Sequence, residues 1–125
     1  MQLLLDTQAA YLWTVNSSAL PESARTAIED VRNRVTLSAA SFWEISIKRA
    51  KGKLDWPEDG FEQLLQSRFI KLAVTPQHGV AAGALPSHHA DPFDRVLIAQ
   101  AQIEGLTLVG ADPAFGLYEV DTLWD

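Results

Sequence analysis

The sequence predicts an α/β fold in which a mostly parallel sheet is covered by helices on both faces. Short apolar runs typical of buried strands alternate along the whole chain with longer stretches of helical periodicity. The chain has 125 residues, of which 47% are apolar and 21% charged, and this excludes intrinsic disorder and low-complexity classes. No cysteine is present, which excludes disulfides and thiolate metal sites. We therefore expect a single domain over residues 1–125.

The first half of the chain alternates two strands with helices. The apolar run at 2–5 predicts a buried strand that ends at Asp6. Pro21 suits the first turn of a helix, and Gly52 is placed to end a long one. The expected elements are a strand at 2–5, helices at 7–15 and 21–32, a strand at 35–37 and a helix at 39–51.

The second half repeats this alternation. Thr75 and Pro76 form an N-cap followed by proline at the first helical position, and Gly105 is placed to end a later helix. The expected elements are a turn at 55–60, a helix at 61–68, a strand at 70–74, a helix at 75–84, a loop at 86–93, a helix at 94–104, a strand at 106–109 and a last strand at 118–120.

The charge distribution limits the classes of partner. A net charge of −6 argues against coating nucleic acid by bulk electrostatics. Seven of the ten Lys and Arg residues nevertheless lie before residue 54, and a local basic cluster beside a bound cation can hold a phosphate chain. No apolar run reaches the roughly 20 residues of a membrane helix, and the start has no basic segment typical of a secretory signal. A soluble, cytoplasmic protein without membrane contact is expected.

Four acidic residues are expected at one edge of the sheet. Asp6 follows the first strand directly, and Asp112 lies three residues past the strand at 106–109. Ligands of open parallel sheets bind outside the carboxyl ends of the strands. Asp94 begins the helix that leads into the strand at 106–109, and a right-handed crossover places that end at the same edge. Glu44, about two turns into its helix, can lean over this edge.

Such a cluster needs a cation or extra protons. Two carboxylates ~4 Å apart repel by about 4 kcal/mol at an effective dielectric constant near 20. Oxygen ligands without His or Cys favour Mg²⁺ or Mn²⁺, and a metal-activated water beside a bound phosphate would hydrolyse a phosphodiester. Each acid also has a purely structural interpretation. Asp6, Asp91 and Asp112 suit N-caps, Asp94 suits the first turn of a helix, and Glu44 fits a capping box with Ser41, although Ser38 is an equally good helix start.

The order of these motifs resembles the PIN domain ribonucleases, specifically the VapC-type toxins of bacterial toxin–antitoxin modules. The resemblance covers nearly the whole chain. It depends on the segments LLLDT at 3–7, LSAASFWEISIK at 37–48, HADPFDRVLIAQA at 89–101 and GLTLVGAD at 105–112. It implies a Rossmann-like, three-layer α/β/α sandwich with Mg²⁺- or Mn²⁺-dependent endoribonuclease activity. It also implies a homodimer neutralised by a cognate VapB-type antitoxin.

By position, the acidic residues of this family fall on Asp6, Glu44, Asp94 and Asp112. By the same resemblance, Asp6 and Asp94 are direct metal ligands, and the other two ligate, orient water or complete a second site. Asp91 lies outside the four-acid pattern and is interpreted as a cap. The family usually has Thr or Ser where this chain has Gly110. That departure leaves open a catalytically degenerate PIN domain that acts as a protein-binding regulator.

Several further side chains have two interpretations. Lys48 and Arg49 either contact RNA phosphates or stabilise the end of their helix, with an ion pair from Glu44 to Lys48. Arg95 either clamps substrate or pairs with a neighbouring carboxylate. His88 and His89 are expected to be solvated rather than metal ligands. Of the four tryptophans, Trp13, Trp43 and Trp124 are expected in the core or an interface, and Trp56 is expected to be exposed.

Overall fold

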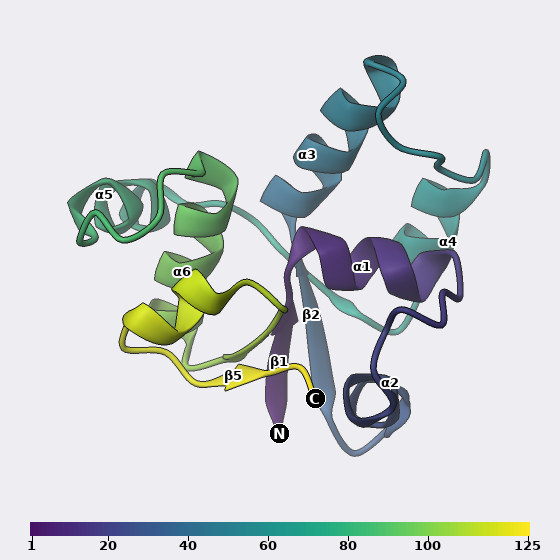
Figure 1. The fold of residues 1–125 in the computed structure, drawn as a ribbon, viewed down its shortest axis with the longest axis horizontal. Helices are drawn as coiled ribbons and strands as arrows, with labels where there is room; N and C mark the ends of the chain where they lie inside the picture. Colours follow the sequence, from purple (N-terminus) through teal and green to yellow (C-terminus); the bar gives the residue numbers. More distant parts are fainter.

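A computed structural model describes residues 1–125 as a five-stranded, all-parallel sheet with helices on both faces (Figure 1). The strands lie in the order β3-β2-β1-β4-β5. In chain order the elements are β1 (Gln2–Leu5), α1 (Thr7–Thr14), α2 (Glu22–Glu29), β2 (Arg34–Ser38), α3 (Ala39–Ala50), α4 (Gly60–Gln66), β3 (Ile70–Leu72), α5 (Pro76–Ala84), α6 (Pro92–Glu104), β4 (Thr107–Val109), the 3₁₀ helix η1 (Pro113–Leu117) and β5 (Thr122–Leu123). The predicted α/β sandwich is confirmed.

The central strand β1 is buried on both faces, as its continuous apolar run requires. Leu3 and Leu5 point into a core formed with α1, α2, α3 and α4. Leu4 points the other way, into a second core formed with α6 and η1. Side chains of successive strand residues alternate between faces, so three adjacent leucines join the two cores. In Figure 1, α5 and α6 lie on one side of the sheet, and α1, α2 and α4 lie on the other.

The strand order positions the functional edge. β1 pairs with β2 on one side and with β4 on the other, so the chain leaves β1 in one direction along the sheet and later returns to its opposite side. The carboxyl ends of β1 and β4 flank this change of direction, where ligands bind in open α/β sheets. The backbone N–H of Asp6 donates to Val109 O (2.9 Å), which joins these two ends.

The last strand and the start of α6 differ from the prediction. The expected strand at 118–120 is wrong, because Pro113 opens η1 and Tyr118 then turns inward to be buried in the second core. The strand that pairs with β4 is Thr122–Leu123. α6 begins at Pro92 rather than Asp94, because Asp91 caps it and accepts the N–H groups of Phe93 and Asp94.

The burial of the tryptophans differs in part from the prediction. Trp56 was expected to be exposed and is buried, with its ring against Tyr11 and Phe61. Trp43 is 64% exposed and meets Phe93 edge to face. Trp13 and Trp124 pack against the first core. None of the helices has both the length and the apolar character that a membrane span requires.

Candidate metal centre

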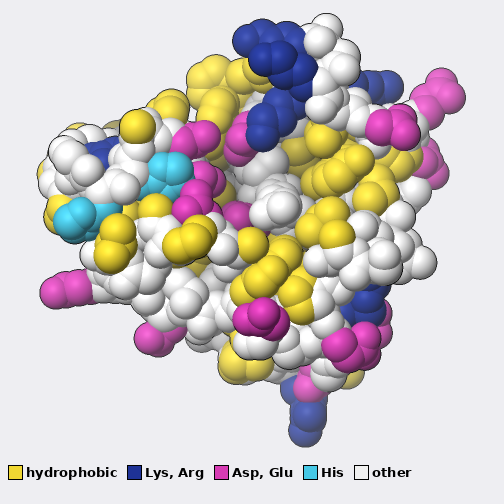
Figure 2. All heavy atoms as spheres, in the orientation of Figure 1, with side chains coloured by type: hydrophobic (Ala, Val, Ile, Leu, Met, Phe, Trp, Pro, Cys, Tyr) yellow, Lys and Arg dark blue, Asp and Glu magenta, His cyan; other side chains and the backbone are white.

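A cleft of about 340 Å³ opens at the carboxyl ends of β1 and β4. Ten residues line it, and the acidic ones are Asp6, Glu44, Asp91, Asp94 and Asp112. Figure 2 shows Asp and Glu side chains gathered between histidines and the Lys and Arg side chains over the end of α3. The structure therefore brings the four acids expected at this edge into one cleft and adds Asp91 to them.

Asp6 lines this cleft directly after β1 and is buried. Its Oδ1 accepts the N–H of Ala9 (2.7 Å) and so caps α1. Burial, and to a smaller extent the charges of Asp94, Glu44 and Asp112, raise the pKa of Asp6 to about 7 against the opposing effect of the Ala9 hydrogen bond. Burial together with neighbouring negative charge makes this carboxyl hard to ionise, and a pKa perturbed in this way inside a cleft is typical of a functional site.

Asp94 enters the cleft from the first turn of α6. Burial is the main cause that raises its pKa to about 6, followed by the charge of Asp91, while His89 acts in the opposite direction. Asp91 caps α6 through Oδ1, which accepts from Phe93 N (2.8 Å) and Asp94 N (3.1 Å). The capping interpretation of Asp91 is confirmed, and the same residue also lines the cleft.

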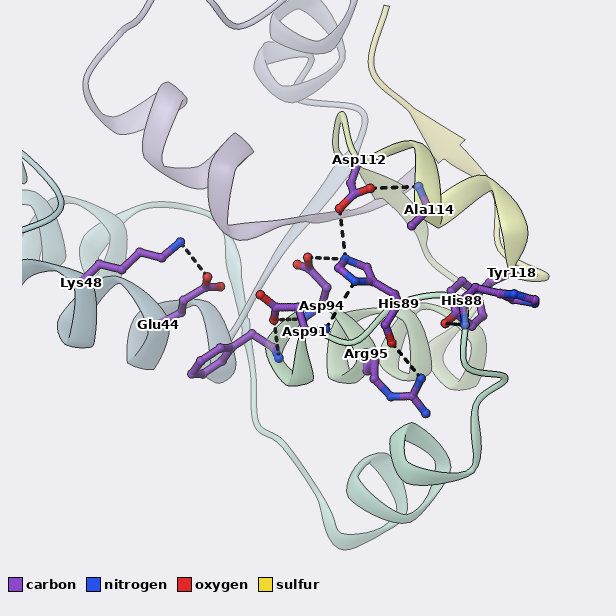
Figure 3. A network of polar contacts seen from close by, with 11 residues as sticks. Glu44, Lys48, His88, His89, Asp91, Asp94, Arg95, Asp112, Ala114 and Tyr118 are labelled. Atoms are coloured by element: carbon purple, nitrogen blue, oxygen red, sulfur yellow. Dashed lines mark hydrogen bonds and ion pairs between the residues drawn. The ribbon is translucent and has the colours of Figure 1, made fainter.

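Glu44 supplies an atom that the protein itself leaves without a partner. Ser38, and not Ser41, caps α3, so Glu44 lies inside the helix and its side chain is only 9% exposed. Its Oε2 pairs with Lys48 Nζ at 2.9 Å (Figure 3), as expected for residues four apart, and this bond raises the pKa of Lys48. Its Oε1 is buried without a hydrogen-bond partner. Such an oxygen costs free energy unless a cation or water meets it.

Asp112 reaches the cleft from the connection between β4 and η1. Its Oδ1 accepts the N–H of Ala114 (2.9 Å) and caps η1. Its Oδ2 lies 3.0 Å from His89 Nε2. Asp6 and Asp112 therefore combine the two roles considered for them, because one oxygen caps a helix and the other remains for the cleft.

His89 lies among the acids, and the expectation that it is solvated is wrong. Its Nε2 lies 2.8 Å from Asp94 Oδ2 and 3.0 Å from Asp112 Oδ2 (Figure 3), and the ring is 16% exposed. His88 is exposed and packs its ring against Tyr118. The only signal in the sequence for this placement of His89 was its position. The loop before α6 leads to the helix end that bears Asp94, so a residue of this loop lies beside that carboxylate.

The basic side chains take different positions. Lys48 lines the cleft, whereas Arg49 is exposed on the same helix. Arg95 does not pair with a carboxylate, which corrects one of its two interpretations. Its guanidinium donates to the backbone carbonyls of Ala82 (2.8 Å), Leu85 (2.8 Å), Pro86 (3.0 Å) and His89 (3.1 Å). These contacts turn its charge toward the loop before α6.

The residues fit a hard divalent cation. Carboxylate oxygens dominate the cleft, the buried Oε1 of Glu44 lacks a partner, and one oxygen of Asp94 lies within 4.8 Å of one oxygen of Asp112. Oxygen donors of this kind suit Mg²⁺ and Mn²⁺. The residues available to hold such an ion are Asp6, Glu44, Asp94 and Asp112.

Comparison with known proteins gives the family. The family model described as PIN domain matches residues 3–121. Ribonuclease VapC22 of Mycobacterium tuberculosis is 31% identical over 113 residues, which are 88% of this chain and 86% of that protein. Among solved structures, VapBC2 from Rickettsia felis, bound to a DNA fragment from its promoter, matches at 18% identity and a TM-score of 0.74, with all of both chains covered. FitAcB from Neisseria gonorrhoeae matches at 19% identity and 0.69, over 98% of this chain and 96% of that one. This chain belongs to the PIN domain family.

Proposed function

We propose that this protein is a metal-dependent endoribonuclease that hydrolyses RNA phosphodiester bonds, and that it is the toxin of a toxin–antitoxin pair. The observation that carries the proposal is the convergence of five carboxylates in one cleft, one of them with a buried oxygen that lacks a partner. The similarity to a protein named ribonuclease, at 31% identity over most of both chains, supports the same function.

The position of each acid in the cleft assigns it a separate role in the proposed mechanism. Asp6 and Asp94 are proposed as the direct ligands of Mg²⁺ or Mn²⁺, because both line the cleft and a cation there would offset the cost of ionising two carboxyls whose pKa burial raises. Glu44 and Asp112 complete the shell or orient a water. When bound, the cation supplies charge that neutralises the phosphate and lowers the pKa of a coordinated water. The chain itself contributes the fixed spacing of the carboxylates, since Asp6 and Asp112 are each tied to a helix end.

The substrate approaches from the side of α3. Lys48 already pairs with Glu44 at the wall of the cleft, and Arg49, the next residue of α3, is exposed and forms no ion pair. We assign both to contacts with RNA phosphates, which are sequence-independent and sensitive to salt. Arg95 acts on substrate only indirectly, through the loop that it holds.

Partner proteins form the second half of the proposal. The similar solved structures include VapBC2 and FitAcB, and a further one is a toxin–antitoxin complex from Klebsiella pneumoniae. We propose by this likeness that the chain forms a homodimer in the cytoplasm and is inhibited there by a VapB-type antitoxin. Co-expression with the adjacent small open reading frame, followed by purification through a tag on this chain, should recover both proteins.

The catalytic proposal is tested by RNA cleavage. Purified, antitoxin-free protein is incubated with RNA and Mn²⁺ or Mg²⁺, alongside Asp6→Asn and Asp94→Asn. Asp121→Asn is the matched control, because this exposed acid precedes β5 and lies outside the cleft. Cleavage should survive in the control and be lost in both cleft variants. Equal cleavage by all four proteins would refute the mechanism. The absence of both cleavage and Mn²⁺ binding that depends on Asp6 would instead favour the degenerate regulator.

A further inference from the structure

We propose that His89 is a positioning residue of the metal centre, which holds Asp94 and Asp112 at a fixed separation through its Nε2–H group. This inference rests on the proposed function, because it concerns the same cleft, but it adds a residue outside the four acids. Its basis is a contact between one imidazole and two carboxylates that come from different parts of the fold.

The two acids held by His89 have no common support. Asp94 lies in the first turn of α6, and Asp112 lies between β4 and η1. His89 Nε2 reaches both, at 2.8 Å and 3.0 Å, with its ring only 16% exposed. Oxygens of Asp94 and Asp112 lie within 4.8 Å of each other, and two carboxylates at this distance repel each other. The imidazole between them is the protein group that keeps the pair together.

The contact made by the other ring nitrogen, Nδ1, indicates whether Nε2 of His89 is a metal ligand or a hydrogen-bond donor. Asp91 donates its backbone N–H to His89 Nδ1 at 3.4 Å. Nδ1 is therefore the acceptor of the ring, and the proton is on Nε2. A protonated Nε2 has no lone pair for a metal ion, so His89 supports the carboxylates from outside the ligand shell. The oxygens that it contacts keep lone pairs free for a cation.

The loop that carries His89 is fixed from two sides. Arg95 donates to the carbonyl of His89 (3.1 Å) and to that of Leu85 (2.8 Å). The hydroxyl of Tyr118 donates to Pro86 O (2.7 Å) and accepts the N–H of His88 (3.1 Å). A side chain held by such contacts is already in position before any ligand binds, as an effective supporting residue must be.

The first experiment measures Mn²⁺ affinity by electron paramagnetic resonance of the free ion. Wild-type protein is compared with His89→Ala, with His89→Gln, whose amide replaces the Nε2–H donor, and with His88→Ala as the neighbouring control. His89→Ala should bind Mn²⁺ about 10- to 100-fold more weakly, the usual effect of losing a supporting partner. His89→Gln should recover most of this loss, and His88→Ala should match wild type.

A second experiment reads the ring directly and does not require a destabilised variant. Nitrogen-15 NMR of the histidine rings in wild-type protein should show His89 protonated at Nε2 both without and with Mg²⁺. A proton that moves to Nδ1 when Mg²⁺ is added would make His89 a ligand and overturn the proposal. Unchanged Mn²⁺ affinity in His89→Ala would overturn it as well, while the nuclease proposal would stand if wild type still binds Mn²⁺ and cuts RNA. Wild-type protein that does neither would refute both.

Discussion

The carboxylate of Asp6 lies directly against the backbone of Gly110. A Cβ atom added to Gly110 would lie 2.5 Å from Asp6 Oδ2 and 2.6 Å from Cε2 of Phe115. Asp6 is held on its other side by the N–H of Ala9, and Phe115 is fully buried. The buried ring of Phe115 has little room to retreat, and a retreat of Asp6 would move its carboxylate within the cleft. The space that a Thr or Ser side chain would need at this position is therefore occupied by the acid itself and by an aromatic ring.

Substitution of Gly110 by alanine is expected to destabilise the fold and weaken metal binding. The added methyl must displace Asp6 or Phe115, and overpacking of this kind costs about 1–3 kcal/mol in the free energy of unfolding. Because Asp6 is a proposed ligand, its displacement should also lower Mn²⁺ affinity. Urea unfolding and Mn²⁺ titration measure the two effects. Gly116→Ala is the matched control, since a Cβ there meets nothing within 4 Å. A Gly110→Ala protein as stable as this control would contradict the close packing.

The stability of the metal-free protein is expected to fall as the pH rises from about 4 to 7. The pKa of Asp6 is raised from 3.8 to about 7 in the folded protein, mainly by burial. Between these two values the unfolded chain has released the proton that the folded protein still binds, so the free energy of unfolding decreases with rising pH. The decrease should be on the order of a few kcal/mol, and Asp94 contributes in the same direction.

Asp6→Asn provides the check on this pH dependence. The amide keeps the Oδ1 acceptor for Ala9 but cannot ionise, so the slope of stability against pH should become shallower while Asp121→Asn keeps the wild-type slope. Saturating Mn²⁺ should offset much of the loss near neutral pH in wild type but not in Asp6→Asn, because only a protein that binds the ion gains from it. Thermal melts at several pH values, with and without Mn²⁺, measure this. A wild-type stability that rises from pH 4 to 7 without metal would contradict the raised pKa.

Replacement of Arg95 by lysine is expected to act on the loop before α6. Lysine cannot serve four carbonyls that converge on one planar guanidinium. Carbonyls left without a donor cost about 1–3 kcal/mol in the free energy of unfolding. The loop carries His89, so Mn²⁺ affinity should fall too. Arg34→Lys, at an exposed position in β2, should leave both quantities unchanged. Full stability in Arg95→Lys would show that these carbonyls do not depend on the guanidinium.

The sequence was sufficient to predict the strands β1 to β4 and the edge of the sheet at which the acids lie, because both follow from local rules. A run of three leucines between polar residues predicts a strand buried on both faces, and residues just after parallel strands meet at one edge. Asp6 and Asp112 satisfy this rule by position. Asp94 follows from its place in the first turn of the helix that leads into β4.

Features that depend on the path of a loop were not predictable in the same way. His89 faces the acids because Arg95 and Tyr118 fix the backbone around it, and no periodicity in the sequence encodes those contacts. Trp56 is buried because Gly60 leaves space for its ring, with a Cβ there only 2.5 Å away from the indole. The expected strand at 118–120 failed because the side chain of Tyr118 is drawn into the core.

Arg49→Ala is expected to weaken RNA binding without changing the fold. Arg49 is exposed near the end of α3, so its removal leaves no buried group without a partner and should change the free energy of unfolding by less than about 0.5 kcal/mol. Loss of one phosphate contact to single-stranded RNA should reduce the slope of log affinity against log salt by about 0.7. Fluorescence anisotropy with labelled RNA, at several salt concentrations and with Asp94→Asn protein to prevent cleavage, measures this slope. Arg32→Ala is the control, because Arg32 is engaged with Asp30 beyond α2 and lies outside the cleft. An unchanged slope in the Arg49 variant would remove Arg49 from the RNA-binding surface and leave Lys48 as the basic side chain at the wall of the cleft.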